Sequence, residues 1–207
     1  MTRITLDKVG KRYAGQWVFR AISDNFSASE KIAVTGFNGS GKSTLLQLLS
    51  AFQTPTEGSI TFESGGSRIS PDQWYKYISC GAPYLDLPED LTLRENVSFF
   101  SSFKPIQQSL SPEQFAEIAE LTHALDKPLK HFSSGMKQRV RLSLAILADV
   151  PTLLLDEPLS NLDRKGMLWY SDMIHRFAES KLVIVCSNNQ EEEISFCTRA
   201  LDINLFK

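Results

Sequence analysis

The sequence predicts an α/β fold built on a mostly parallel sheet, and three observations lead to this prediction. Two unbroken apolar runs, residues 152–155 and 182–186, have the composition and length of strands that are buried on both faces. A further apolar stretch, residues 31–35, precedes a glycine-rich run and then a helical pattern. Strands that alternate with helices in this way are typical of parallel sheets, because the helices cover the sheet's two faces.

Residues 36–44, which read Gly-Phe-Asn-Gly-Ser-Gly-Lys-Ser-Thr, are the motif around which the chain is organised. They fit the phosphate-binding loop G-x-x-x-x-G-K-[ST], and the flanking strand and helix argue against a chance match in a glycine-rich turn. The glycines permit turns that aim backbone N–H groups at phosphate oxygens. The pattern assigns Lys42 to the β- and γ-phosphates and the Ser43 hydroxyl to Mg²⁺. The sequence therefore predicts a P-loop NTPase core, with further nucleotide-binding candidates at Gly36, Phe37, Asn38, Gly39, Ser40, Gly41 and Thr44.

Length and composition fit one medium-sized domain, or a core with a subdomain. The chain has 207 residues, of which 42% are hydrophobic, and its net charge is -2. No global basic field favours nucleic acid, so we expect no nucleic-acid partner. The three cysteines are far apart and suit a reducing compartment. Because there is no signal-peptide pattern and no stretch near the roughly 20 apolar residues of a membrane helix, we expect any spanning part to belong to another chain.

The N-terminal part of the chain, up to residue 35, is predicted to form a β-rich subdomain with antiparallel strands. Ile4 and Leu6 alternate with polar residues as on a half-buried strand, and apolar residues between 18 and 26 mark further short extended pieces. Tyr13 lies in a polar turn, residues 11–15. An aromatic ring in such a turn can stack on a base, and an ordinary core or surface tyrosine is the alternative.

Residues 81–133 are predicted to form a helical subdomain inserted between core strands. Prolines divide this stretch, and helices are expected at 92–103, with a capping box, and at 112–125, with Ser111 as N-cap. The basic residues that follow, between 137 and 141, are expected on a solvated helix face. The predicted organisation is a single domain, residues 1–207, with a nucleotide-binding core and β subdomain in residues 1–80 and 134–207. Other expected elements are helices at 42–51, 134–148, 163–180 and 190–196 and strands at 59–62, 77–80 and 200–203.

Asp156 and Glu157 directly follow the buried run at residues 152–155. In open α/β sheets, ligands bind beyond the carboxyl ends of the strands. Asp156 is therefore a candidate ligand for the Mg²⁺ that Ser43 also contacts. Glu157 is a candidate catalytic general base that polarises an attacking water. An isolated Asp-Glu pair is more often a surface turn, but the preceding strand and the upstream phosphate loop favour the catalytic interpretation.

Residues 132–139, Phe-Ser-Ser-Gly-Met-Lys-Gln-Arg, resemble the signature motif of the ABC ATPases. Ser133 and Gly135 match that motif, whereas its commonest form differs at the positions of Phe132, Ser134 and Met136. The resemblance extends over nearly the whole chain. Residues 158–163 resemble the family's D-loop, residues 91–96 resemble the start of its helical subdomain, and Tyr13 stands where the family has an adenine-stacking aromatic residue.

The resemblance implies a site shared between two chains. Two cassettes pair head to tail and enclose two ATP molecules, so that Ser133 and Gly135 contact the γ-phosphate on the opposite subunit, with Asp163 of the D-loop at the same site. It also implies ATP and Mg²⁺ as ligands. The implied partners are a second cassette, identical or different, and integral membrane transporter subunits, at the cytoplasmic, inner face of the cell membrane.

Two positions depart from the family pattern. The family has a glutamine after the strand expected at 77–80, where this chain has Ala82, and a switch histidine where Ser187-Asn188-Asn189 stands. Asn188 is a catalytic candidate because its amide can hydrogen-bond a γ-phosphate, although it cannot carry positive charge. Two interpretations remain open: harmless drift in a working ATPase, or a slow cassette that forms the weaker half of an asymmetric pair.

The predicted function is the ATP-binding and ATP-hydrolysing subunit of an ABC transporter, similar in length and layout to the smallest cassettes of heme-exporter and lipoprotein-release type. One alternative is a soluble ABC ATPase of DNA repair or translation. The stretch between Lys42 and Ser133 is too short for the coiled-coil insertion of the repair proteins, and the translation proteins usually carry two cassettes. A P-loop kinase or GTPase is disfavoured by the signature and D-loop stretches and by the lack of an Asn-Lys-x-Asp motif.

Overall fold

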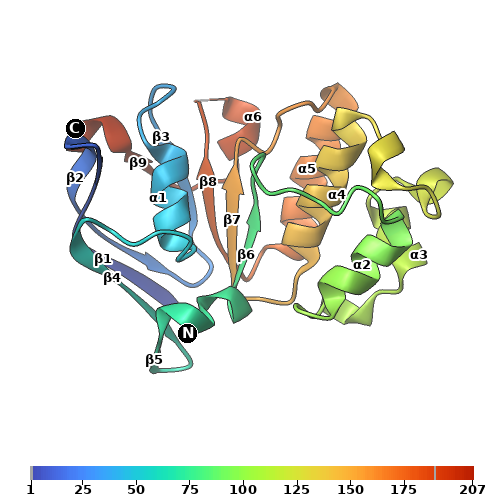
Figure 1. Ribbon diagram of the computed structural model, residues 1–207, viewed down its shortest axis with the longest axis horizontal. Helices are drawn as coiled ribbons and strands as arrows, with labels where there is room; N and C mark the ends of the chain where they lie inside the picture. The colour runs from blue at the N-terminus through green and yellow to red at the C-terminus, as the bar shows by residue number, and fades with distance from the viewer. Residues whose placement is uncertain (1, 189) are drawn as a thin grey trace.

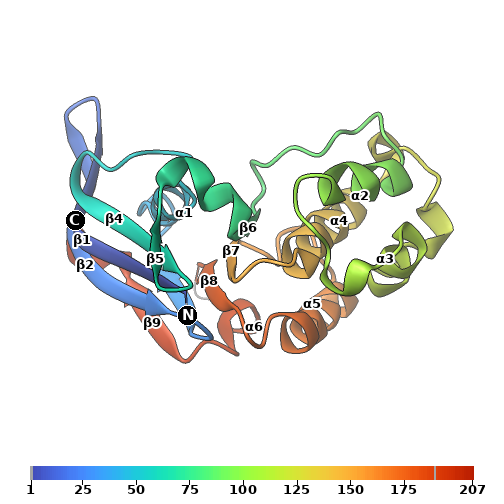
Figure 2. The same cartoon turned by 90° about the horizontal axis from the view of Figure 1, so that it is seen from below.

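The computed structural model describes residues 2–188 and 190–207, so Met1 and Asn189 lie outside the described residues. An antiparallel sheet stands at one end of the molecule, a parallel sheet lies in the middle, and a group of helices forms the other end (Figure 1). The view from below shows the same order (Figure 2). The predicted fold class, a P-loop NTPase core with an antiparallel β subdomain and a helical part, is confirmed.

The parallel sheet brings the motifs of the sequence to one edge. Its strand order is β6-β7-β8-β3-β9, and all its pairings are parallel. Asp156, the last residue of β7, pairs with Cys186, the last of β8, and Cys186 pairs with Val34 of β3. The phosphate loop, the Asp-Glu pair and the Ser187-Asn188 turn therefore leave the sheet side by side. The strands are β3 Lys31–Thr35, β6 Ile78–Gly81, β7 Thr152–Asp156, β8 Leu182–Cys186 and β9 Arg199–Asp202.

Strands β7 and β8 are buried on both faces, as their apolar runs predict. Their side chains alternate between two cores. Leu153 and Val183 belong to the core formed with the helices, whereas Leu154 and Ile184 belong to the core shared with α1, Lys42–Leu49, and the antiparallel sheet. α1 lies between the two sheets, so both hold the helix that follows the phosphate loop (Figure 1).

The antiparallel sheet has the order β2-β1-β4-β5. The short extended pieces expected between residues 18 and 26 are one continuous strand, and Tyr13 is the last residue of β1 instead of a turn residue. Pairing persists through register shifts after Leu6, and Ala21 adopts a φ of 59°. Such bulges interrupt the alternation of apolar residues without ending the strand. The strands are β1 Arg3–Tyr13, β2 Gln16–Ser27, β4 Glu57–Ser64 and β5 Ser67–Ile69.

The helices form where their start signals predict, but several end early. The capping boxes at Thr92 and Ser111 are both present. The helix expected at 112–125 ends at Ile118, because Glu120 has a φ of 57° and the Leu121 N–H bonds back to the Ala116 carbonyl at 2.7 Å. This is a Schellman termination, which buries Leu121. The remaining helices are α2 Leu93–Ser101, α3 Pro112–Ile118, α4 Ser134–Leu147, α5 Arg164–Phe177 and α6 Glu191–Ile194, with 3₁₀ segments at Pro71–Lys76, Gln107–Ser109, Thr122–Ala124, Leu129–His131 and Ile203–Phe206.

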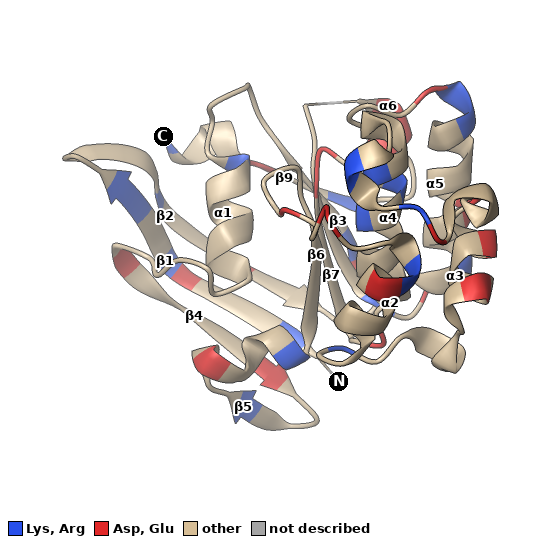
Figure 3. Cartoon of the chain, turned by 45° about the vertical axis from the view of Figure 1, so that its right-hand side comes forward, with Lys and Arg blue, Asp and Glu red and all other residues tan. Residues whose placement is uncertain are grey.

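The expectation that the basic residues of α4 form a solvated face is wrong. Lys137 pairs with Glu89 at 2.6 Å, and the Arg139 guanidinium lies 4.7 Å from the centroid of the Trp169 ring. Arg141 Nε donates to the Leu85 carbonyl at 3.1 Å. The basic band of α4 is visible in Figure 3, with acidic residues on neighbouring segments. Sequence alone places these cations on one helix but does not reveal the loops that pack over it.

No helix within residues 2–188 and 190–207 combines the length and the apolar content that crossing a membrane requires. The boundaries 1–80, 81–133 and 134–207 stay a prediction. Helix α4 packs against both β6 of the parallel sheet and α2 of the helical part, so it joins the two regions.

Candidate nucleotide-binding site

The glycines of the phosphate loop have the turn conformations that the motif predicts. Gly36, Gly39 and Gly41 have φ values of 150°, 75° and 104°. At Gly41 an added Cβ would lie only 2.4 Å from Val18 Cγ1, so a side chain there would collide with the Val18 side chain. No described side chain caps the N-terminus of α1. The N–H groups of its first turn are therefore available to an anion.

A chain of hydrogen bonds connects the three catalytic candidates. Lys42 Nζ donates to Asn188 Oδ1 at 2.5 Å and to the carbonyls of Gly36 at 2.9 Å and Phe37 at 3.2 Å. Asn188 Nδ2 donates to Glu157 Oε1 at 2.7 Å. The Lys42 side chain is buried. One amide thus bridges the lysine and the glutamate at the carboxyl edge of the sheet.

The backbone at Glu157 turns sharply out of strand β7. Its φ is 44°, in the left-handed region, which costs a residue with a side chain roughly 1–2 kcal/mol. The turn is held from both sides, because Glu157 N–H donates to the Cys186 carbonyl at 2.9 Å and Ser160 N–H donates to the Glu157 carbonyl at 3.1 Å. Strain that is retained in this way is common at functional sites.

Asp156 has the features of a metal ligand. Its side chain is 2% exposed, and burial raises the pKa of this carboxyl while a hydrogen bond with Ser43 opposes the rise. Its Oδ1 atom has no hydrogen-bond partner among the described residues. A buried carboxylate oxygen without a partner fits a cation. The described residues contain no cluster of three His, Cys, Asp or Glu side chains that could hold a metal, and Mg²⁺ suits such a site because phosphates and water supply most of its ligands.

Tyr13, the candidate for binding the base, and residues of the phosphate loop line one hollow. Phe37, by contrast, is 79% exposed, and Ser40 is buried behind the loop. Of the residues predicted to bind the nucleotide within the phosphate loop, Gly36, Phe37 and Ser40 do not line the hollow. Its lining consists of Tyr13, Val18, Asn38, Gly39, Gly41, Lys42, Ser43, Thr44 and Glu157.

Ser133, Gly135 and Asp163 line a different depression. Ser133 caps α4 by accepting from Met136 N–H at 3.2 Å, and Asp163 caps α5 by accepting from Gly166 N–H at 2.7 Å. Two helix N-termini therefore open toward the same depression, which Arg139 and Lys165 also line. Glu120 lines the depression as well, and its carboxylate pairs with Arg139 at 3.1 Å and with Lys165 at 3.3 Å. The two helix N-termini carry partial positive charge there, which favours an anion.

The structure reveals site residues that sequence reasoning missed. Gln138 is buried and donates to the Pro158 carbonyl at 2.8 Å, which ties α4 to the D-loop segment. Glu193 is buried as well, and its Oε1 accepts from Leu159 N–H at 3.2 Å. Polar residues at helical positions usually face solvent, so no local signal distinguishes these two. Ala82, which the family resemblance aligns with a glutamine, is fully buried just after β6.

Similarity to known proteins agrees with this geometry. The sequence pattern of the ABC transporter family matches residues 19–160. The cytochrome c biogenesis ATP-binding export protein CcmA of Chelativorans sp. (strain BNC1) is 28% identical, over 90% of this chain and 91% of its own. YybJ of Bacillus subtilis (strain 168), an uncharacterized ABC transporter ATP-binding protein, is 31% identical, over 88% and 84% respectively.

Similarity in three dimensions covers almost the whole chain. The dimeric structure of MJ0796, a bacterial ABC transporter cassette, superposes with a TM-score of 0.81 at 22% identity, over 97% of this chain and 94% of that one. At 22% identity the structural similarity establishes the fold alone. The match to the family's sequence pattern establishes membership of the family. The chain therefore belongs to the ABC transporter family, as one of its ATP-binding subunits.

Proposed function

We propose that this chain binds Mg-ATP at the phosphate loop and hydrolyses it as one of two paired cassettes that drive transport through separate membrane subunits. The bridge from Lys42 through Asn188 to Glu157 is the observation that carries the proposal. It sets a phosphate-binding cation and a carboxylate base on either side of one amide, beside an uncapped helix N-terminus. A nucleoside triphosphate fits this combination of donors and base.

In this proposal the loop N–H groups and Lys42 hold the phosphates, and Tyr13 stacks on the base. Asp156 and Ser43 would hold Mg²⁺, whose charge offsets that of the β- and γ-phosphates. Glu157 takes a proton from the attacking water as the new P–O bond forms, while the bond between the γ-phosphorus and the bridging oxygen breaks and that oxygen leaves with ADP. The hydrogen bond from Asn188 keeps the Glu157 carboxylate oriented during this proton transfer. Because an amide donates an uncharged hydrogen bond, we infer slower turnover than a protonatable side chain would support at this position.

A second cassette completes the site. The depression lined by Ser133, Gly135 and Asp163 lies apart from the phosphate loop, and two helix N-termini open into it. In a head-to-tail pair, this depression would cover the γ-phosphate held by the partner. The two helix N-termini that open there support this pairing, because their partial positive charge suits a phosphate.

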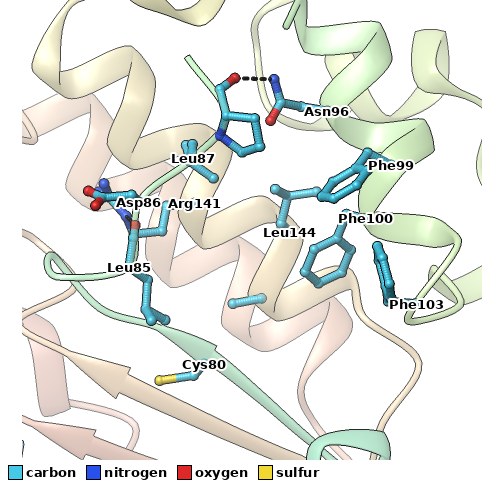
Figure 4. A pocket seen from close by; sticks show the side chains of 12 residues that line it. Cys80, Leu85, Asp86, Leu87, Asn96, Phe99, Phe100, Phe103, Arg141 and Leu144 are labelled. Atoms are coloured by element: carbon cyan, nitrogen blue, oxygen red, sulfur yellow. Dashed lines mark hydrogen bonds between the residues drawn. The ribbon is translucent and has the colours of Figure 1, made fainter. Parts of the chain in front are cut away.

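The groove beside α2 is the proposed contact with a membrane subunit. It is predominantly apolar, with Phe99 and Phe100 on one side and Leu144 of α4 opposite, and with Asp86 and Arg141 near one end (Figure 4). Phe99 and Phe103 are 51% and 63% exposed, and their rings pack edge to face at 5.1 Å. Exposed apolar surface of this kind marks interaction sites. We propose a helix of a membrane subunit as the occupant, which places the chain at the inner, cytoplasmic face of the membrane.

The test of nucleotide binding uses Lys42→Ala. We expect wild-type protein to bind Mg-ATP by calorimetry and to release phosphate, and Lys42→Ala to bind about 10- to 100-fold more weakly, as for the loss of a charge-assisted hydrogen bond. Lys76→Ala, at an exposed lysine of the 3₁₀ segment, is the control. Equal affinity in Lys42→Ala and wild type would contradict binding at this loop.

The groove is tested separately. Phe103→Asp should leave the ATPase activity of the purified cassette unchanged and should reduce its recovery with membrane subunits from detergent-solubilised membranes. Phe52→Asp, at another exposed phenylalanine, is the matched control. Full recovery of the Phe103→Asp complex would contradict docking in this groove.

A further inference from the structure

Tyr13 is held in place by residues that lie outside the recognised motifs. Its hydroxyl donates to Gln53 Oε1. The Lys11 ammonium lies over the ring, 5.1 Å from its centroid, and is itself held by a 2.9 Å bond to the Thr54 carbonyl. The ring is 45% exposed and lines the same hollow as the phosphate loop. An exposed tyrosine would otherwise sample several rotamers, so these contacts select one.

Gln53 is in turn fixed to helix α1. Its side-chain Nε2 donates to Gln47 Oε1 at 2.6 Å, and its backbone N–H donates to the Gln47 carbonyl at 3.2 Å. The chain can double back in this way because Ala51, just after the helix, has a φ of 59°. Gln53 thus bonds Gln47, on the last turn of the helix, through both its side chain and its backbone.

Both ends of a single helix therefore serve the nucleotide. Lys42 begins α1 at the phosphate loop, and Gln47 lies near its C-terminal end, where it carries Gln53 and, through it, Tyr13. An eight-residue helix of this kind is about 12 Å long. A rigid element of fixed length that connects the phosphate end to the base end sets their separation, which is the requirement for holding both parts of one ligand.

Further hydrogen bonds connect the hairpin that bears Tyr13 to the segment that follows α1. Thr56 N–H donates to the Gly10 carbonyl at 2.8 Å, and Arg12 N–H donates to Thr56 Oγ1 at 3.2 Å. These bonds hold the backbone of the hairpin tip, whereas Gln53 and Lys11 hold the ring itself. Tyr13 remains 45% exposed with Lys11 over its ring, so part of its surface is available to a base.

We propose that Gln53, supported by Gln47, is a positioning residue that orients the Tyr13 ring for stacking on the nucleobase. The inference rests on the proposed function, because it concerns the base of a nucleotide whose phosphates occupy the loop. Gln53 is then a residue that affects only the binding of the base. Loss of Gln53 should weaken ligands that carry a base and should leave base-free ligands unaffected.

The experiment compares the affinities of Mg-ATP and of inorganic tripolyphosphate with Mg²⁺, measured by calorimetry. Gln53→Ala and Tyr13→Phe each remove the same hydrogen bond from opposite sides. Each should weaken ATP binding about three- to tenfold and leave tripolyphosphate binding unchanged. The double variant should be no weaker than either single one, because the two residues act as one unit. Gln73→Ala, at a half-buried glutamine of the 3₁₀ segment, is the control and should match wild type.

The outcomes separate this inference from the proposed function. Tyr13→Ala should weaken ATP more than Gln53→Ala does, without affecting tripolyphosphate, and this variant tests the stacking itself. If Tyr13→Ala weakens ATP while both Gln53→Ala and Tyr13→Phe do not, stacking stands and the positioning role is overturned. Equal weakening of both ligands by Gln53→Ala would overturn it as well, since that indicates local damage. Should Gln53→Ala not fold, Tyr13→Phe provides the same comparison.

Discussion

Asn188 donates its side-chain amide to the Glu157 carboxylate at 2.7 Å, although 31 positions separate the two residues in the sequence. The same amide accepts from Lys42 through its oxygen. Asn188 thus takes part in the site through both ends of its side chain. In the alignment that the family resemblance implies, Asn188 stands in place of a histidine; it bridges Lys42 and Glu157 but has no capacity for charge.

Asn188→His should raise ATP turnover, and Asn188→Ala should lower it. A neutral imidazole can accept from Lys42 and donate to Glu157, as the amide does, and a protonated one supplies a charge-assisted bond to the developing charge of the γ-phosphoryl group. A gain of about 1.4 kcal/mol would be tenfold in rate. Steady-state phosphate release at saturating Mg-ATP measures it. Activity in Asn188→His that is unchanged or lower would favour harmless drift over a slow cassette.

Glu157→Gln should abolish hydrolysis and retain ATP binding. The amide keeps the shape of the side chain but cannot take the proton from water, a loss expected to lower kcat by about 10²- to 10⁴-fold. With ATP trapped, the protein should elute as a dimer in size-exclusion chromatography. Glu191→Gln, at an exposed glutamate on α6, controls for a general effect of charge. A monomer at every concentration with ATP present would argue against the paired arrangement.

Ala82→Gln should destabilise the fold. The Ala82 side chain is fully buried directly after β6, so a glutamine there has no open space and brings an unpaired amide into the interior. Overpacking of this kind costs about 1–3 kcal/mol. The midpoint of thermal unfolding should fall by several degrees, whereas Pro83→Gln, at the exposed neighbouring position, should change it little. A stable Ala82→Gln protein with higher turnover would show that the 82–85 segment rearranges to present the glutamine.

Lys181 should make stability depend on pH in the alkaline range. Burial lowers the pKa of this lysine to about 8, against the opposing charge of Asp149. Between pH 8 and 10.5 the unfolded chain therefore binds more protons than the folded one, so this group raises the free energy of unfolding as pH increases. The rise is at most about 3 kcal/mol. Below pH 8 the lysine is charged in both states and its penalty is fully present.

The measurement compares urea midpoints at pH 7.5 and pH 10 for wild type and Lys181→Met. The variant should be less stable overall, because the carbonyls of Ile146 and Ala148 lose their donor. Its dependence on pH should nevertheless be flatter. Lys76→Met, at an exposed lysine, should keep the wild-type slope. The same slope in Lys181→Met and wild type would show that other groups set it.

Local patterns predicted most elements, and the failures have physical causes. The apolar runs of β7 and β8 are unambiguous because a strand between two layers has no polar face. The capping signals at Thr92 and Ser111 act within four residues and were predicted correctly. The end of α3 was not, because a left-handed Glu120 is stabilised by burying Leu121 in a core that the sequence does not display.

The sequence by itself determined the phosphate loop, the buried strand that ends in Asp156 and Glu157, and the family resemblance, since each resides in a short run of residues. Only the tertiary structure decided which distant side chains complete the site. Asn188 meets Lys42 across 146 positions because β3 and β8 are parallel neighbours that end at one edge, and Gln53 meets Tyr13 because α1 lies between the two sheets. Short-range sterics and periodicity act along the chain, whereas strand order and the burial of single polar groups depend on packing between segments far apart in sequence.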